Sequence, residues 1–228
     1  MKKISLLFRI LCGLGKSVYI NFKVLPFLQA IKLPILVSYQ TRIYGISKKT
    51  IEINVPKIRT GMISIGIFER SDGIMGPKHC YFGTDQSSKI IFEGDFAMVY
   101  GGCLKASGSG VLKIGDKVTF NTHSKVLCSH KICIGNNVRF GWDTTLKDGD
   151  GHPIKNEEGE IINSPKSIIV GNNVWVGAEV TLLKGARIPN GSIVGYRSLV
   201  TKRFDEDNVI IAGSPAKIMK QNITWSDK

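Results

Sequence analysis

A six-residue period near the carboxyl end constrains the fold of this chain more than any other feature. An α-helix repeats every 3.6 residues and a β-strand every two, so neither element alone produces a period of six. Three hexads instead form the three flat sides of one solenoid coil, with an aliphatic side chain inside each side and a glycine where the backbone bends. The leading aliphatic positions are Val170, Val176, Leu182, Ile188, Val194 and Val200.

The same phase continues upstream and extends the predicted solenoid through most of the chain. The segment IGDKV at 114–118 returns as IGNNV at 134–138 and as VGNNV at 170–174. Before residue 110 the pattern weakens to short aliphatic runs, which predict irregular early coils. The upstream hexad positions, with a two-residue slip midway, are Ile114, Phe120, Val126, Ile134, Phe140 and Leu146.

These patterns predict three parts. Residues 1–45 form an amphipathic helical segment, residues 46–211 form a parallel β-helix with a loop at 148–167, and residues 212–228 form a short closing helix and tail. Pro215 supports that last helix because proline is favoured at the first helical position. Each coil is stabilised mainly by the coils beside it, so both ends of the solenoid need caps.

The composition describes a globular, strongly basic protein. Apolar residues make up 43% of the chain and charged residues 21%, which excludes a wholly disordered chain. The formal net charge is +13, and no Asp or Glu precedes Glu52. Such a charge predicts a polyanionic partner. Nucleic acid is disfavoured, because the chain has neither a recognition-helix pattern nor aromatic residues within a basic run.

The basic residues Lys2, Arg9, Lys16 and Lys23 recur every seven positions. On a helix they make one stripe beside apolar residues, which is typical of a surface helix. Residues 1–30 then either associate peripherally with a membrane or pack on the protein's own body or a subunit interface. The charges interrupt any membrane-spanning stretch, and no small-residue signal cleavage site is present. We therefore expect a cytoplasmic protein, at the inner face of the membrane if the helix binds lipid.

One polar, glycine-rich segment, DGDGHPIKNEEGEIINSPK, interrupts the repeat after Leu146. Insertions in solenoids form loops that often carry function. His152 lies in this loop, and a histidine can accept a proton near neutral pH. Asp148 and Asp150 are the two carboxylates that could orient it. A histidine on a surface loop without a catalytic role is the alternative interpretation.

The segments IIVGNNVWVGAEVTLLKGARIPNGSIVGYRSLVTK and IIAGSPAKIMK resemble the hexapeptide-repeat acyltransferases that use acetyl-CoA. The amino-terminal part and FGWDTTLKDGDGHPI are similar to O-acetyltransferases of bacterial capsule and lipopolysaccharide biosynthesis. The resemblance implies an all-β, left-handed parallel β-helix that assembles as a homotrimer. It also implies an acetyltransferase that moves an acetyl group from acetyl-CoA to a sugar hydroxyl. The acceptor would be a cell-surface polysaccharide or its precursor, free or lipid-linked.

The resemblance assigns roles to individual residues. His152 corresponds to the general base, which takes the proton of the acceptor hydroxyl as that oxygen attacks the thioester, without an acyl-enzyme. The family's donor groove lies between two subunits, where basic side chains meet the phosphates of the cofactor. The matching cofactor-binding positions are Trp175, Gly177, Ala178, Tyr196, Thr201, Lys202, Lys217 and Lys220.

Other functions stay open from the sequence alone. Related transferases N-acetylate amino-sugar nucleotides or O-acetylate serine, and a non-catalytic β-helix protein would show no affinity for the cofactor. Carbonic anhydrases share this fold and hold zinc with three histidines, but His79, His123 and His130 lack supporting spacing. The five cysteines are an odd number without C-x-x-C spacing, which argues against both disulfides and a zinc cluster. No metal site is predicted.

Overall fold

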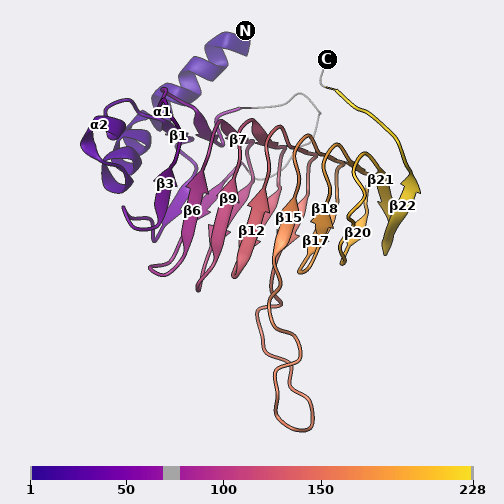
Figure 1. Cartoon of the computed structure of the whole chain (residues 1–228). Helices are drawn as coiled ribbons and strands as arrows, with labels where there is room; N and C mark the ends of the chain where they lie inside the picture. The colour runs from indigo at the N-terminus through magenta and orange to yellow at the C-terminus, as the bar shows by residue number, and fades with distance from the viewer. Residues whose placement is uncertain (1, 69–77, 227–228) are drawn as a thin grey trace.

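The computed structural model describes residues 2–68 and 78–226, with side chains from residue 6 onward. Its body is a prism of stacked coils with three parallel sheets as its sides, a left-handed parallel β-helix as predicted (Figure 1). Each full coil contributes one short strand to each sheet, and neighbouring coils pair in register.

The strands of each sheet stack along the prism in the order of the coils. Sheet A holds β1 (Ile35–Val37), β4 (Ile63–Ile65), β7 (Phe96–Met98), β10 (Val118–Phe120), β13 (Arg139–Phe140), β16 (Trp175–Val176), β19 (Ile193–Val194), β21 (Ile210–Gly213) and β22 (Ala216–Lys220). Sheet B holds β2 (Arg42–Tyr44), β5 (Tyr81–Gly83), β8 (Cys103–Ala106), β11 (Lys125–Cys128), β14 (Thr145–Lys147), β17 (Thr181–Leu183) and β20 (Leu199–Val200). Sheet C holds β3 (Ile51–Ile53), β6 (Lys89–Phe92), β9 (Val111–Ile114), β12 (Lys131–Ile134), β15 (Ile168–Val170) and β18 (Arg187–Ile188).

The hexad residues form the core that their spacing predicts. All six aliphatic residues of the carboxyl-terminal repeat are buried, with at most 2% of their surface exposed. In the earlier coils the interior is aromatic, and the rings of Phe120 and Phe140 stack with centroids 4.0 Å apart. The early region also forms regular strands, so the solenoid begins at Ile35, earlier than the predicted boundary at residue 46.

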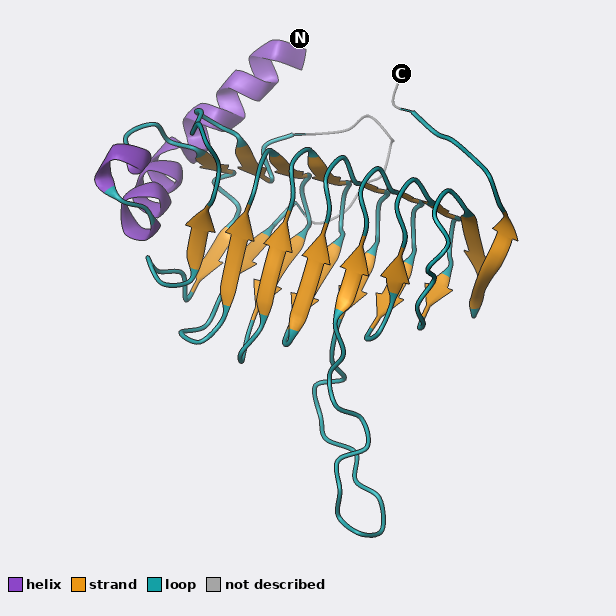
Figure 2. Cartoon of the chain, in the orientation of Figure 1, coloured by secondary structure: helices purple, strands orange, loops and turns teal. Residues whose placement is uncertain are grey.

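The first helix, α1 (Lys2–Val24), covers the open edge of sheet A (Figure 2). Ser17 and Asn21 on its inner face replace a strand, because their side chains hydrogen-bond the main chain of β1 at Ile35 and Val37. Gly13 lets the helix approach closely, since a Cβ atom there would lie 2.2 Å from the carbonyl oxygen of Val37. A second helix, α2 (Phe27–Ala30), follows. The cap that the solenoid needs is therefore built from small and polar residues of α1.

This orientation decides where the two predicted stripes of α1 lie. The apolar stripe faces solvent, as the exposed side chains of Leu7, Leu11 and Leu14 show. Of the basic stripe, Lys16 contacts the body, because it donates to the main-chain carbonyls of Tyr39 and Thr41. Lys23 is exposed and donates to the hydroxyl of Tyr19 on the same helix. No helix among the described residues is long and apolar enough to cross a membrane.

The prediction of a closing helix within residues 212–228 is wrong. Residues 216–220 form β22, which pairs antiparallel with β21 through a turn at Ser214 and Pro215. The exposed edge of β21 offers a row of unpaired backbone groups, and satisfying them outweighs the helix propensity of five residues. Beyond β22 the tail turns back along the prism.

Candidate active site

The predicted loop is a long arm that projects from the corner between sheets B and C (Figure 2). It leaves after β14 and returns at β15, and a single antiparallel bridge joins Lys155 to Ile161 across it. His152 lies near the base of the arm and its side chain is exposed. The arm therefore presents a histidine outside the coil.

A network of hydrogen bonds fixes the backbone around His152. The side-chain amide of Asn163 donates to the main-chain carbonyl of His152 and to the carboxylate of Asp150, both at 2.8 Å. The side-chain oxygen of Asn163 accepts from the main-chain nitrogen of Ile154 at 2.7 Å. Lys184, from the next coil, donates to Asp150 at 2.5 Å and to the main-chain carbonyl of Asn163 at 3.0 Å. We call Asp150, Asn163 and Lys184 the arm clamp.

The arm clamp also sets the charge of Asp150. The hydrogen bond from Lys184, followed by that from Asn163, lowers the pKa of Asp150 below its ordinary value. Within the described residues, its carboxylate bonds the clamp and not the imidazole of His152. Asp150 therefore positions the main chain that carries His152, a role different from the predicted direct contact with the ring.

Asp148, the other predicted partner, is a structural residue of the coil, which corrects its predicted role beside His152. Its buried carboxylate accepts hydrogen bonds from the main-chain nitrogens of Ser129 and His130 at 2.7 and 2.9 Å. The hydroxyl of Ser129 donates to the same carboxylate at 2.8 Å. These bonds hold the corner where the hexad register slips by two residues.

The predicted cofactor positions fall at separate places on one chain. Gly177, Ala178 and Tyr196 meet at the corner between sheets A and B, where the Tyr196 hydroxyl donates to Glu179. This hydrogen bond to a carboxylate is the main cause that raises the pKa of Tyr196. Gly177 is required there by close packing, because a Cβ atom would lie 2.9 Å from the carbonyl oxygen of Val194.

Trp175 lies on the outer face of sheet A and is 47% exposed. The ring of Trp225, from the returning tail, packs against it with centroids 6.4 Å apart. The indole nitrogen of Trp225 donates to the carbonyl of Asn173 at 2.8 Å, which anchors the tail. The tail thus contributes an aromatic residue beside a predicted cofactor position.

The remaining cofactor positions carry the basic groups. Thr201 and Lys202 lie at the corner between sheets B and C, two coils beyond the arm. Lys217 and Lys220 are exposed on β22. Thr201 and Lys202 thus lie at a different corner from Tyr196, whereas Lys220 follows Trp175, Ile193 and Ile210 along one row of sheet A.

The other histidines form no metal centre. His123 adopts the left-handed conformation that this corner requires, with φ at 58°, and its Nδ1 lies 3.8 Å from the carboxylate of Asp143. Its ring packs edge-on against Tyr100. His79 and His130 are exposed. Over residues 2–68 and 78–226, no group of three or more His, Cys, Asp or Glu side chains could hold a metal ion.

Two members of the arm clamp, Asn163 and Lys184, were not predicted from the sequence. The repeat held a signal for Lys184, because it stands one coil before Lys202 at the same corner from which the arm leaves. Asn163 lies inside the irregular segment, where no period predicts which residues meet.

No family model matches the chain, but individual proteins do. WbbJ of Escherichia coli K12, assigned to lipopolysaccharide biosynthesis as an O-acetyl transferase, is 31% identical over 153 residues, which cover 62% of this chain and 76% of WbbJ. The polysialic acid O-acetyltransferase of Neisseria meningitidis is 48% identical over 99 residues, 43% of this chain and 46% of that protein. The galactoside O-acetyltransferase of Escherichia coli K12 is 33% identical over 113 residues, 48% of this chain and 54% of that protein. The match thus spans about half the length of these last two relatives.

The crystal structure of NeuO, a polySia specific acetyltransferase, superposes with a TM-score of 0.56 at 23% identity. It covers 86% of this chain and 79% of that chain, and it supports the fold. Together with the identity to WbbJ over three quarters of that protein, these findings show that the chain belongs to the hexapeptide-repeat O-acetyltransferases, a family of enzymes whose co-substrate is acetyl-CoA.

Proposed function

We propose that this enzyme transfers an acetyl group from acetyl-CoA to a sugar hydroxyl of a cell-surface polysaccharide or its precursor. The names of its relatives, which refer to lipopolysaccharide biosynthesis, polysialic acid and galactosides, support a sugar acceptor. The observation that carries the proposal is the exposed His152 on an arm whose main chain is fixed by Asn163. A general base needs such a fixed position and access to its substrate.

The proposed reaction is a direct transfer. His152 accepts the proton of the sugar hydroxyl while the hydroxyl oxygen attacks the thioester carbonyl carbon. A C–O bond forms, the C–S bond breaks, and the thiolate of coenzyme A leaves and takes up a proton. The exposed lysines at 202, 217 and 220 suit the phosphates of the donor, because phosphate oxygens accept charge-assisted hydrogen bonds. Trp175, Thr201 and Tyr196 would line the path of the pantetheine arm.

We propose further that the active site is shared between subunits of a homotrimer. Three isoleucines of the arm, Ile154, Ile161 and Ile162, are more than half exposed within one chain. Apolar side chains on a projecting arm are expected to be buried by a second copy of the chain. That contact would bring His152 of one subunit towards Trp175 and Tyr196 of its neighbour, which in one chain lie on sheet A and at its corner with sheet B, away from the corner that carries the arm.

The test begins with His152→Gln, beside His79→Gln as a matched control on another exposed histidine. We expect the first variant to lose about 10²–10⁴-fold in kcat, the range of general base catalysis, with acetyl-CoA binding measured by thermal shift retained. The control is expected to keep its activity. A His152→Gln enzyme with more than about a tenth of the normal kcat would contradict the assigned role.

The shared site has its own test. Inactive His152→Gln and Trp175→Ala chains are refolded together, and light scattering measures the mass against 25.1 kDa for one chain. If sites form between subunits, random mixing restores about a quarter of the sites, because that share pairs two intact halves. A fully active monomer, or a mixed trimer without recovered activity, would overturn the shared site.

We also propose that the solvent face of α1 and α2 binds a lipid surface. Exposed apolar side chains cover this face, and they continue from α1 into α2: Leu7, Phe8, Leu11, Leu14, Val18, Phe22, Phe27, Leu28 and Ile31. The inner face of α1 is committed to β1, so the apolar face has no partner among the described residues. The surrounding segment has no acidic residue before Glu52, which suits an anionic membrane, at the cytoplasmic face.

Because Lys16 is committed to the body, the apolar contact should dominate membrane binding and resist salt. Cys12 is exposed on α1 and can carry an environment-sensitive fluorophore. We expect a blue shift with anionic vesicles that persists at high salt. Leu7→Ser with Leu11→Ser should abolish the shift, whereas Ile169→Ser, an exposed isoleucine on sheet C, should not. No binding by the parent protein, or equal binding by the double variant, would overturn the proposal.

A further inference from the structure

The outer face of sheet B gathers basic side chains and tyrosines from five successive coils. Alternate residues of each strand point outward, and the register of the sheet aligns them into two rows across β2, β5, β8, β11 and β14. These five strands contain no Asp or Glu. We call the two rows the sheet B face. One row holds Arg42, Tyr81, Cys103, Lys125 and Thr145, and the other holds Tyr44, Gly83, Lys105, Leu127 and Lys147.

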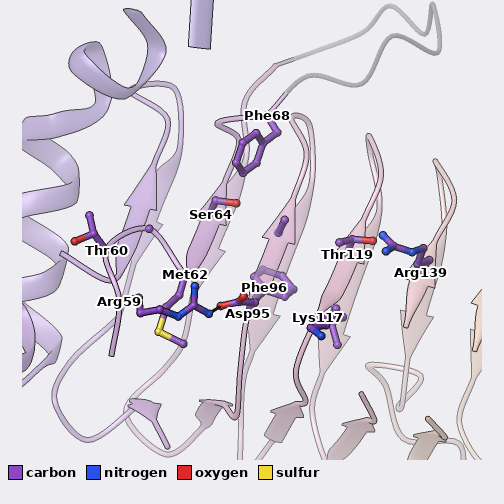
Figure 3. A pocket seen from close by; sticks show the side chains of 13 residues that line it. Arg59, Thr60, Met62, Ser64, Phe68, Asp95, Phe96, Lys117, Thr119 and Arg139 are labelled. Carbon is purple, nitrogen blue, oxygen red and sulfur yellow. Dashed lines mark hydrogen bonds and ion pairs between the residues drawn. The ribbon is translucent and has the colours of Figure 1, made fainter. Parts of the chain in front are cut away.

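Elsewhere on the prism, basic side chains are neutralised by a neighbouring coil. On sheet C, Lys113 pairs with Glu93 at 2.9 Å. At the corner between sheets C and A, the guanidinium of Arg59 pairs with the carboxylate of Asp95 at 2.5 Å (Figure 3). Stacked coils thus readily place a carboxylate beside a basic residue.

The sheet B face has no such compensation. The side chains of Arg42, Lys105 and Lys125 are exposed, and none of the three has a hydrogen bond or ion pair with the described part of the chain. Asp85 lies at the adjoining corner with sheet C, but its carboxylate accepts from the main-chain nitrogens of Ser87, Ser88 and Gly108. The positive charge of the face is therefore open to a ligand.

Cys103 shows that two of these charges act at one place. It pairs in register with Lys125 and lies two residues before Lys105 on the same strand. Burial raises the pKa of the Cys103 thiol, and the positive charges of Lys105 and Lys125 oppose this rise. The two lysines therefore share one part of the face.

The aromatic part of the face is built around Gly83. A Cβ atom at Gly83 would lie 2.8 Å from Cε1 of Tyr81 and 3.1 Å from its hydroxyl, so the Tyr81 ring lies along the sheet over this glycine. Tyr44 pairs in register with Gly83 and is 66% exposed. Aromatic rings offer a flat apolar surface on which the apolar side of a sugar ring can stack.

The sheet B face ends at the base of the arm. Lys147 is the last residue of β14, and its ammonium group donates to the main-chain carbonyl of Asp150 at 3.4 Å, two residues before His152. Four strand spacings separate β2 from β14, about 19 Å, which is long enough for several linked sugar rings. A polymer that crosses these strands would run along the prism towards His152.

We propose that the sheet B face binds an acidic polysaccharide, the acceptor of the acetyl group. Sugar rings stack on Tyr44 and Tyr81, and repeated anionic groups of the polymer lie against Arg42, Lys105 and Lys125. The inference rests on the proposed acetyl transfer to sugars and names the acceptor as a polymer with repeated negative charges. The bases of a nucleic acid could also stack on tyrosines, but continuity with the arm favours a sugar polymer.

The experiment measures binding to the full chain by calorimetry, with three probes: an oligogalacturonate, a neutral maltooligosaccharide of equal length and an oligothymidylate of equal charge. The parent protein should bind the oligogalacturonate most tightly, with an affinity that falls as salt rises, and should not bind the neutral probe. Lys105→Gln with Lys125→Gln should weaken oligogalacturonate binding by about tenfold, as expected for two exposed charge contacts. Tyr81→Leu should also weaken it, with the salt dependence unchanged.

Lys117→Gln with Lys131→Gln is the matched control, because it removes the same net charge from exposed positions outside sheet B. This control should bind the oligogalacturonate like the parent protein. Equal binding by the Lys105→Gln, Lys125→Gln variant and the parent would overturn the inference. Oligothymidylate binding as tight as that of the oligogalacturonate would overturn it in favour of nucleic acid.

A second readout is acetyl transfer to a panel of acidic and neutral oligosaccharides. With the best acidic acceptor, the Lys105→Gln, Lys125→Gln variant should raise KM and keep kcat within about twofold, because the face contacts substrate and transition state alike. Transfer to neutral members only, or an unchanged KM, would overturn the inference and leave the proposed function intact. Transfer to no member of the panel, although the face still binds the oligogalacturonate, would instead overturn the proposed function.

Discussion

The side-chain amide of Asn163 donates to the main-chain carbonyl of His152, the proposed general base, at 2.8 Å across the base of the arm. The two residues are eleven positions apart, and the intervening chain forms the projecting part of the arm. The hydrogen bond therefore fixes the backbone of His152 independently of the arm tip. Catalytic geometry should depend on this contact more than on the rest of the arm.

Asn163→Ala should lower kcat by about tenfold or more, because a misplaced base loses orientation while the donor site is untouched. The KM for acetyl-CoA should stay within about twofold of the parent value. Asn156→Ala is the control, since Asn156 bonds Glu160 farther out on the same arm. Equal loss in both variants would indicate general disorder of the arm rather than positioning of His152.

The pH dependence of the arm clamp follows from Asp150. Its pKa lies below the ordinary value of 3.8 because Lys184 and Asn163 stabilise the carboxylate. A group with a lowered pKa stabilises the folded arm above its ordinary pKa, and this contribution is lost as the pH falls through the lowered value. The acidic limb of the kcat profile above pH 5 should therefore be the same in Asp150→Asn as in the parent enzyme. A shift of that limb by about half a pH unit would contradict the assignment.

Asp148→Ala should destabilise the coil by about 3 kcal/mol, because it leaves the half-buried main-chain nitrogens of Ser129 and His130 without their acceptor. Urea unfolding monitored by circular dichroism measures the loss. Asp205→Ala removes an exposed carboxylate and serves as the control, with an expected change within about 0.5 kcal/mol. If both variants unfold at the same urea concentration, the corner does not depend on Asp148.

Cys80 should contribute a stability change at alkaline pH. Burial raises the pKa of its thiol from 9.0 to about 11, and its sulfur donates to the carbonyl of Val99 at 3.5 Å. The raised pKa stabilises the folded protein fully below pH 9, and that contribution falls as the unfolded thiol ionises between pH 9 and 11. By pH 10 the loss should be about 1 kcal/mol.

The measurement compares urea unfolding of the parent protein and Cys80→Ala at pH 8 and pH 10, so that other titrating groups cancel. The difference in free energy of unfolding between the two proteins should shrink by that amount at pH 10. A difference that stays constant with pH would show that the thiol titrates alike in both states.

The period of six was sufficient to predict the interior of the prism, because a coil position that must be aliphatic is repeated in every turn. It could not predict which face of α1 packs inward. There, hydrogen bonds from Ser17 and Asn21 to an open strand edge outweighed the burial of the leucine stripe. The same demand of an open edge turned residues 216–220 into a strand despite Pro215.

The candidate site was predicted less completely than the core. His152 was found because an irregular loop broke a regular repeat. The roles of Asp148 and Asp150 could not be predicted in this way. Both depend on partners, such as Ser129 and Lys184, that the coils bring from distant parts of the chain. Arg59 and Arg139 likewise line one cavity on the outer face of sheet A only because the coils stack (Figure 3), and no spacing in the sequence relates them.

The antiparallel direction of β22 has a consequence for how long such a prism can grow. A parallel sheet of identical rungs has no intrinsic last member, and its bare edge would accept a further rung from another molecule. In sheet A the chain reverses direction at one edge and lays a helix across the other. The repeat alone sets no limit to the number of coils that can stack, whereas β22 and α1 cover the two edges of sheet A. Removal of both segments should therefore allow prisms to stack end to end into an open-ended filament.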